Sequence, residues 1–162
     1  VHFHDLALMD YDGEVELGNA EGAQASIRQT WSNSRQGTSY GTGKFPCVSI
    51  DTFVRNRGLP RVDLIKLDLE GADGLALDGA QKTLETFRPQ VAVSIYHDPT
   101  HFWDLPLRLM KSLPDYLFLV RHYSLARWET IFYALPRERV FPSRVAVPGC
   151  GSGITIPLSC SS

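Results

Sequence analysis

Apolar residues in the middle of the chain recur with two different periods, which predict alternating strands and helices. Four short apolar runs bounded by polar or turn residues predict β-strands. These runs are Leu64–Glu70, Val91–His97, Tyr116–Ser124 and Glu129–Leu135. Between the first two runs, residues 72–87 repeat apolar side chains at steps of three and four, which predicts one amphipathic helix packed on a sheet.

Two further helices are predicted around these runs. Asp51–Arg57 is expected to form a short helix that stops at Gly58. Thr100 is expected to cap a helix that continues through Leu113, and Pro106 can bend its early part.

The first 44 residues are less regular. Residues 1–8 alternate enough to predict a strand, and Asp12–Gly13 predicts a turn into a second short strand at Glu14–Leu17. From Gly18 to Lys44 the chain is rich in Gly, Ser, Asn, Gln and Thr, and this stretch is expected to be a long loop.

The order of these elements predicts an α/β fold. Strands that alternate with helices are typical of a mainly parallel sheet covered by helices. The last two strands are joined by the short Leu125–Trp128 link, so they can pair closely only as an antiparallel hairpin. We therefore expect a mixed, mostly parallel sheet that ends in an antiparallel hairpin.

Composition favours one compact domain and excludes some classes of partner. The 162 residues are 43% hydrophobic, and a formal charge of −2 without a long basic run argues against nucleic-acid binding. The three cysteines form no C-x-x-C pair, which favours a reduced compartment and predicts a cytoplasmic location. No apolar run approaches the roughly 20 residues that span a bilayer, so no integral membrane segment is expected, while peripheral membrane association stays open.

Charged residues in the run 64–70 mark a candidate site. Period-two alternation places Lys66, Asp68 and Glu70 on one face of the strand. Ligands of open α/β sheets bind outside the carboxyl ends of strands, where Asp68 and Glu70 would lie. A structural alternative is a Lys66–Asp68 ion pair with a carboxylate at the start of the next helix.

Two histidines follow neighbouring strands. His97 ends the run Val91–His97 at the same carboxyl edge, where an imidazole could accept a proton from a hydroxyl group. His122 lies near the end of a third strand, and a histidine hydrogen-bonded inside the sheet edge is as good an interpretation as a functional one.

The chain also carries a glycine-rich stretch near its end. Gly149–Gly153 has the G-x-G-x-G pattern of a cofactor-binding turn, but such a turn must lead into a helix. The following residues are β-branched and include Pro157, which disfavours a helix. We expect residues 137–162 to form a flexible tail instead.

Several stretches match the signatures of a known family in the same order. Ser49–Val54 and Asp63–Ala72 resemble the T-L-D-x-F and IK-D-EGAE signatures of FkbM-type methyltransferases. Further stretches similar to that family are Ala7–Gly13, Leu77–Ala80, Ile95–His97, Phe102–Pro106, Arg121–Ser124 and Glu129–Ala134. The resemblance covers about residues 1–136, and it departs from the signature at Asp73–Gly74, where the family tends to have Glu and a larger residue.

This resemblance implies a Rossmann-like class I methyltransferase fold that uses S-adenosylmethionine. The glycine turn and the ribose-binding carboxylate of that fold would precede Val1, so residues 1–136 would be a partial domain with the family's third to seventh strands. The run 64–70 would then have an unpaired edge, open to self-association. The chain alone would bind the cofactor at about millimolar concentration rather than micromolar, because two charge-assisted anchors would be missing.

The resemblance also implies residue roles. Asp68, Glu70 and His97 would form the catalytic group, with Asp68 nearest the transferred methyl. Asp5 and Asp68 would contact the cofactor, and Glu70 and His122 the acceptor, a hydroxyl of a small molecule or sugar. No metal is implied.

Two other classes of function are considered. A non-catalytic fragment or interaction module would keep the acidic site without binding a cofactor. A hydrolase that uses Asp68, Glu70 and His97 is disfavoured, because the sequence has no nucleophile elbow and no spaced metal triad.

Overall fold

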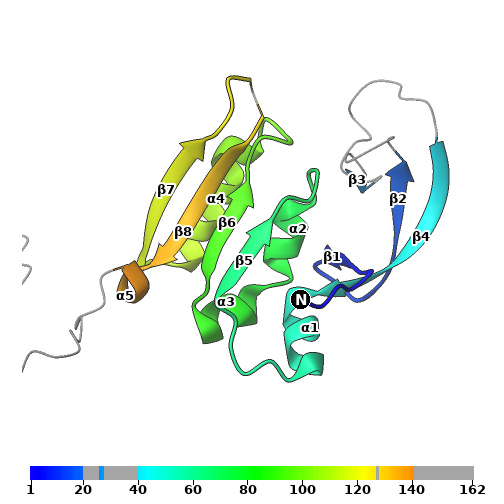
Figure 1. Ribbon diagram of the computed structural model, residues 1–162, viewed down its shortest axis with the longest axis horizontal. Helices are drawn as coiled ribbons and strands as arrows, with labels where there is room; N and C mark the ends of the chain where they lie inside the picture. Colours follow the sequence, from blue (N-terminus) through cyan, green and yellow to red (C-terminus); the bar gives the residue numbers. More distant parts are fainter. Residues whose placement is uncertain (20–25, 28–39, 127, 141–162) are drawn as a thin grey trace, which may run out of the picture.

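Two four-stranded sheets organise the part of the chain that the structure describes. The computed structural model describes residues 1–19, 26–27, 40–126 and 128–140. The strands of the first sheet lie in the order β1-β4-β2-β3 and those of the second in the order β5-β6-β8-β7 (Figure 1). Each sheet has one parallel and two antiparallel pairings. The mixed α/β class is confirmed, but the expected single, mostly parallel sheet is not found.

The first sheet is built by the N-terminal third of the chain. Its strands are β1 (Ala7–Met9), β2 (Gly13–Asn19), β3 (Ser26–Ile27) and β4 (Tyr40–Ser49). β4 lies between β1, which runs parallel to it, and β2, which runs antiparallel. The predicted turn at Asp12–Gly13 and the strand after it are confirmed, whereas the predicted first strand is limited to residues 7–9.

The long loop expected from Gly18 to Lys44 is wrong where the end of β2, the strand β3 and the start of β4 lie within it. β4 begins at Tyr40 and pairs with β2 as far as Cys47. Gly41, Gly43 and Pro46 interrupt the apolar alternation that marks a strand, so the sequence gives little local signal. The partner strand supplies the hydrogen bonds that local propensity does not predict. The remainder of the expected loop, residues 20–25 and 28–39, lies outside the described residues.

The second sheet contains all four of the strands predicted from the middle of the chain. Its strands are β5 (Leu64–Leu67), β6 (Gln90–Ser94), β7 (Tyr116–His122) and β8 (Thr130–Pro136). β5 and β6 are parallel, and β7 and β8 form the expected antiparallel hairpin. β5 lies at an edge of the sheet, as expected. Because β5 and β6 end three residues earlier than predicted, the residues expected at their ends lie in the loops that follow.

The first helix follows β4 directly, begins one residue before the predicted start and stops at Gly58 as predicted. α1 (Ile50–Arg57) begins after Ser49, whose hydroxyl accepts a hydrogen bond from the Thr52 N–H at 3.2 Å. It ends at Gly58, which adopts the left-handed conformation with φ 59°. Glycine has no Cβ and takes this conformation at little cost, so it terminates the helix.

The single helix predicted over residues 72–87 is two helices, which corrects that prediction. They are α2 (Asp73–Asp78) and α3 (Gln81–Phe87), separated at Gly79 and Ala80. The Gly79 carbonyl accepts a hydrogen bond from the Asp51 N–H at 2.9 Å, and a Cβ at Gly79 would meet the Met9 carbonyl oxygen at 2.2 Å. Contact with β1 and α1 therefore interrupts the helix, although the apolar stripe continues across the break.

The longest helix, α4 (His101–Ser112), covers the region predicted as helical and continues through Pro106. Its start differs from the prediction, because the Thr100 side chain does not cap it. The Asp98 carboxylate accepts hydrogen bonds from the Thr100 N–H and hydroxyl, at 2.7 and 2.6 Å. Asp98 thus supplies the stabilising carboxylate near this helix start, and these bonds lower the pKa of Asp98.

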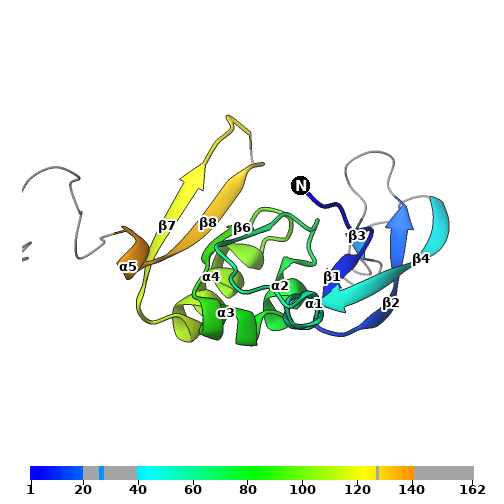
Figure 2. The same cartoon turned by 60° about the horizontal axis from the view of Figure 1, so that its bottom comes forward.

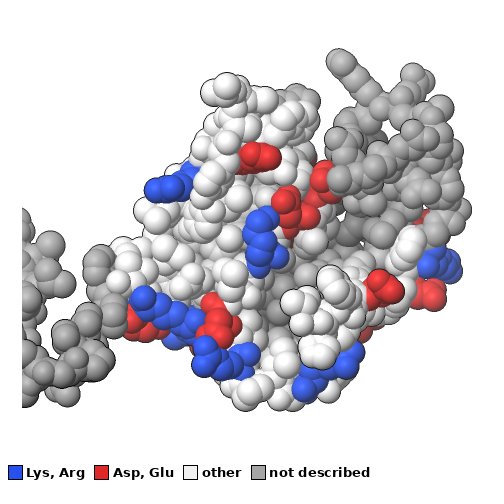
Figure 3. Space-filling model, in the orientation of Figure 1, with Lys and Arg blue, Asp and Glu red and all other residues white. Residues whose placement is uncertain are grey.

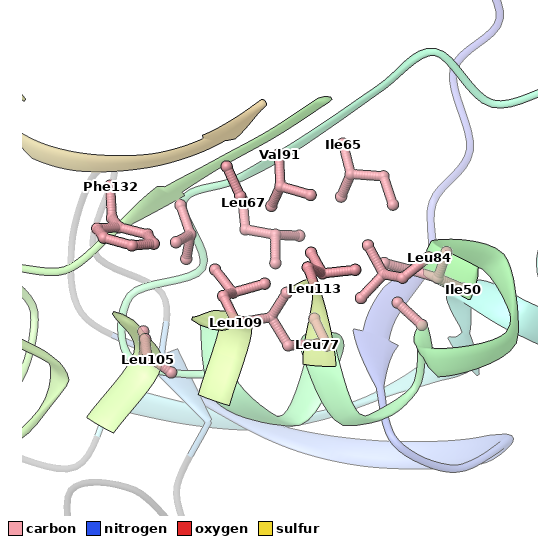
Figure 4. Close-up of a cluster of buried hydrophobic side chains, with 14 of the residues drawn as sticks. Ile50, Ile65, Leu67, Leu77, Leu84, Val91, Leu105, Leu109, Leu113 and Phe132 are labelled. Carbon is pink, nitrogen blue, oxygen red and sulfur yellow. The ribbon is translucent and has the colours of Figure 1, made fainter. Parts of the chain in front are cut away.

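The main core lies between the second sheet and the helices on one of its faces. Figure 2 shows α2, α3 and α4 on the same side of this sheet. Side chains from both layers interdigitate there, including those of Leu67, Val91, Leu84, Leu109 and Phe132 (Figure 4). Burying a side chain of this size contributes about 1.5–3 kcal/mol, which makes this layer the main source of stability.

A smaller cluster joins the first sheet to α2. Met9, Val15 and Cys47 from the first sheet pack with Ala72, which precedes α2. The start of α2 is therefore fixed from both sides, by the second sheet and by β1.

The chain continues after β8 into a short helix, α5 (Arg137–Val140). Glu138 pairs with Arg88 at 2.7 Å, and Arg139 pairs with Asp63 at 3.1 Å. The first four residues of the predicted tail are thus attached to the domain. The glycine-rich stretch at 149–153 lies outside the described residues.

Candidate functional site

The candidate site lies at the carboxyl ends of the parallel strands β5 and β6. β5 ends at Leu67 and β6 at Ser94, so residues 68–72 and 95–98 form neighbouring loops at this edge. Glu70 and Gly71 both have positive φ, 50° and 102°. This turn folds the chain back on itself before α2 begins at Asp73.

His97 stands at the centre of a carboxylate–histidine cluster formed with Asp68, Glu70 and Asp73. Its Nε2 lies 3.3 Å from Asp68 Oδ1 and 3.7 Å from Glu70 Oε2. Its Nδ1 lies 3.2 Å from Asp73 Oδ2. The predicted meeting of Asp68, Glu70 and His97 at one edge of the sheet is therefore found.

Burial differs sharply within this cluster. The side chains of His97 and Asp73 are 4% and 0% exposed, whereas those of Asp68 and Glu70 are 48% and 28% exposed. The imidazole of His97 and the carboxylate of Asp73 thus form the buried part of the cluster, and the other two carboxylates are partly exposed to solvent. Figure 3 shows acidic side chains next to a basic one on this face of the molecule.

Asp73 is the member of the cluster that sequence reasoning missed. Its carboxylate accepts hydrogen bonds from the Leu69 N–H at 3.1 Å and the Gly71 N–H at 3.3 Å. The available signal was an acidic residue in the first turn of a helix directly after a glycine turn, where free N–H groups are expected.

Asp68 is held on its other side by β5 and β6. Lys66 Nζ lies 3.1 Å from Asp68 Oδ2 and 3.4 Å from Ser94 Oγ, and the Tyr96 hydroxyl donates to Asp68 Oδ1 at 3.2 Å. Burial by itself would raise the pKa of Asp68, but hydrogen bonds from Ser94 and Lys66 outweigh it and lower that pKa. The structural alternative, a Lys66–Asp68 ion pair, is thus present together with the cluster.

The cluster shifts the titration of two ring side chains. Burial lowers the pKa of His97, but the hydrogen bond to Asp73 and the charges of Asp73, Glu70 and Asp68 outweigh it, so the pKa lies above its ordinary value. Burial, followed by the nearby charge of Asp68, raises the pKa of Tyr96 to about 12. Tyr96 therefore stays a hydrogen-bond donor throughout the physiological range.

His97 Nε2 is buried but has no hydrogen-bond partner among the described residues. The carboxylates of Asp68 and Glu70 accept hydrogen bonds and cannot donate them when ionised. If the imidazole is neutral and the lone pair is on Nε2, no neighbouring group donates a hydrogen bond to it. Nε2 can then be satisfied in two ways: it takes up a proton, or it accepts a hydrogen bond from the hydroxyl group of a ligand.

The structure does not bring Asp5 or His122 to this cluster. Asp5 is exposed, and no hydrogen bond or ion pair within the described ranges joins it to the cluster. His122 is exposed, and its Nδ1 lies 2.8 Å from Thr130 Oγ1 on β8. This contact matches the structural alternative for His122, and the predicted roles of both residues remain predictions.

Other features of the surface lie apart from the cluster. A shallow groove of about 330 Å³ between α1 and α3 is lined by Asp51, Arg55, Leu59, Lys82, Thr86 and Phe87, none of which belongs to the cluster. Within the described part of the chain, no group of His, Cys, Asp and Glu side chains has the arrangement of a metal site. None of the described helices combines the length and apolar character needed to cross a bilayer.

Comparisons with known proteins agree with the resemblance of the motifs. The family model described as the methyltransferase FkbM domain matches residues 4–120. The crystal structure of methyltransferase FkbM from Methylobacillus flagellatus KT is similar, with 31% sequence identity and a TM-score of 0.51. That similarity covers 56% of this chain and 23% of the other. No curated protein matches the sequence significantly.

Proposed function

The chain belongs to the methyltransferase FkbM family, and we propose that it takes part in transferring a methyl group from S-adenosylmethionine to a hydroxyl group of a small molecule or sugar. In this proposal His97 is the general base, and Asp68 and Glu70 lie beside the reacting groups. The family match does not favour the alternative of an interaction module without catalysis.

One observation carries the proposal: a buried imidazole nitrogen, His97 Nε2, faces two carboxylates and has no hydrogen-bond partner in the part of the chain that the structure describes. A hydroxyl acceptor would donate its hydrogen bond to Nε2 and give up its proton there as the new bond forms. Glu70 makes the longest of the three contacts with His97, at 3.7 Å. Its side chain is therefore the one that would move aside when the acceptor hydroxyl binds to Nε2.

The cofactor supplies a methyl group on a positively charged sulfur. The negative charges of Asp68 and Glu70 at this edge would stabilise that positive charge, and both carboxylates are partly open to solvent. Asp68 would lie nearest the transferred methyl, with its carboxylate oriented by Lys66 and Tyr96. Asp5 is proposed to approach the adenosine side.

The parallel pair β5 and β6, followed by the antiparallel hairpin β7–β8, supports the Rossmann-like architecture that we propose for the complete fold. In that architecture the loops after parallel strands hold the ligand. The carboxylate–histidine cluster lies in two such loops.

The proposal predicts a defined loss of activity. In the protein at its natural length, transfer of a radiolabelled methyl group to a panel of hydroxyl acceptors is expected, and His97→Gln should lower kcat by about 10²–10⁴-fold. Calorimetry should show unchanged binding of S-adenosylhomocysteine to this variant, because the imidazole contacts the acceptor. His2→Gln, which changes an exposed histidine, serves as the matched control. Equal rates for His97→Gln and wild type would contradict the role of His97.

A further inference from the structure

Asp73 is the most deeply buried carboxylate of the cluster, and the reaction proposed above gives it no part. It is fully buried at the first residue of α2 and contacts His97 from the side opposite Asp68 and Glu70. A buried ionisable group is costly unless it is hydrogen-bonded. Its partners therefore indicate what it does.

The hydrogen bonds of Asp73 determine which nitrogen of His97 carries the hydrogen. Oδ1 accepts from the Leu69 N–H, and Oδ2 accepts from the Gly71 N–H and lies 3.2 Å from His97 Nδ1. An ionised carboxylate can only accept hydrogen bonds, so Nδ1 donates in this contact, whereas Nε2 makes no hydrogen bond to any of the described residues. In the neutral imidazole the lone pair is then on Nε2, which lies between Asp68 and Glu70.

We propose that Asp73 is a positioning residue that holds His97 in the Nδ1–H tautomer and aims the Nε2 lone pair at the outer carboxylates. The Leu69 and Gly71 N–H groups fix the Asp73 carboxylate, and the positive φ angles of Glu70 and Gly71 create the turn that presents them. The tautomer is inferred from the hydrogen bond between Nδ1 and Asp73 and from the lack of a hydrogen bond at Nε2 among the described residues. Its importance for methyl transfer rests on the proposed function.

Other charged groups also face His97. Asp68 and Glu70 approach from the loop after β5, with Lys66 behind Asp68. The Tyr96 ring lies 4.2 Å from the His97 ring, and His101 on α4 interacts with His97 electrostatically. Asp73 is distinguished from these groups by its full burial and by its bond to Nδ1.

Nitrogen-15 NMR of the histidine side chains tests the proposal in the 162-residue chain without substrate. Above the pKa of His97, the wild type should show a protonated Nδ1 and an unprotonated Nε2. In Asp73→Asn the side-chain amide can donate to Nδ1, so the tautomer should reverse to Nε2–H and the pKa of His97 should fall. Asp78→Asn, which changes an exposed aspartate of the same helix, should leave both properties unchanged.

Activity measurements complete the test in the protein at its natural length. Asp73→Asn should lower kcat by about 10²-fold or more with a smaller change in KM, and its acidic limb in the pH–rate profile should move to lower pH. An Nε2–H tautomer in the wild type would overturn the proposal even if the variant did not fold. A folded Asp73→Asn chain with an unchanged tautomer and an unchanged pKa of His97 would overturn it as well. An Nδ1–H tautomer combined with full activity of His97→Gln would instead refute the proposed function and leave the positioning role intact.

Discussion

The carboxylate of Asp51 on α1 accepts hydrogen bonds from both the backbone N–H and the hydroxyl group of Thr83 on α3, at 2.8 and 2.7 Å. It also accepts one from the Lys82 N–H at 3.0 Å. Asp51 belongs to the stretch that resembles a family signature, and the structure gives it the role of capping a helix 30 residues further along the chain. This part of the motif therefore stabilises the fold.

Replacing Asp51 with alanine should destabilise the protein by about 2–3 kcal/mol, because α3 loses its N-terminal acceptor and Thr83 is buried. Urea denaturation measures this change. Glu85→Ala removes an exposed carboxylate from the same helix and should change stability by less than about 0.5 kcal/mol. Equal stabilities of the two variants would show that Asp51 is not an effective cap.

Gly79 should tolerate no side chain, because a Cβ there would lie 2.2 Å from the Met9 carbonyl oxygen. Backbone atoms cannot move aside as a flexible side chain can, so Gly79→Ala should cost about 3 kcal/mol or more. Gly74→Ala is the matched control, since its Cβ would meet Leu105 at 3.4 Å, close to ordinary contact distance. This control should be neutral or stabilise α2 by up to about 1 kcal/mol. Thermal unfolding of both variants compares them, and a stable Gly79→Ala protein would contradict the packing of the α2–α3 junction against β1.

Glu138 should titrate far below its ordinary value. The two hydrogen bonds from Arg88 lower the pKa of Glu138 from 4.5 to about 2. Because the folded-state pKa is depressed, this pair stabilises the fold above about pH 4.5, and the contribution is lost as the pH falls towards 2. The side chain is 53% exposed, so the contribution should stay under about 1 kcal/mol.

Carbon-13 NMR of the carboxyl groups measures the pKa of Glu138 directly. Arg88→Ala should return this pKa towards 4.5. Arg88→Lys keeps the positive charge but cannot form two parallel hydrogen bonds, so it should give an intermediate value. A Glu138 pKa that is the same in all three proteins would show that Arg88 does not hold α5 in place.

Tyr96 should remain protonated up to unusually high pH. Burial and the charge of Asp68 raise its pKa to about 12. Removing that charge with Asp68→Asn should lower the pKa of Tyr96, because the phenolate is no longer repelled. NMR of ring-labelled tyrosine at pH 11 should detect a larger ionised fraction of Tyr96 in Asp68→Asn than in the wild type, with Tyr96→Phe used to assign the signal. Ionisation of Tyr96 to the same extent in both proteins would contradict the contact with Asp68.

The sequence by itself determined the four strands of the second sheet, because each lies in a short apolar run bounded by polar or turn residues. Ile65 and Leu67 face the core and Lys66 faces outward, as their alternation predicts. The antiparallel hairpin followed from a link too short for a crossover. The convergence of Asp68, Glu70 and His97 could also be predicted, since the ends of parallel strands share one edge.

Tertiary structure alone decided the remaining features, since they depend on contacts between residues far apart in the chain. β4 forms because β1 and β2 pair with it, despite glycines and a proline that weaken its local pattern. The predicted helix divides at Gly79 because Met9 and Asp51 reach it from other elements. Asp73 becomes part of the candidate site because the turn at Glu70–Gly71 buries its carboxylate against His97, a contact that no periodicity in the sequence encodes.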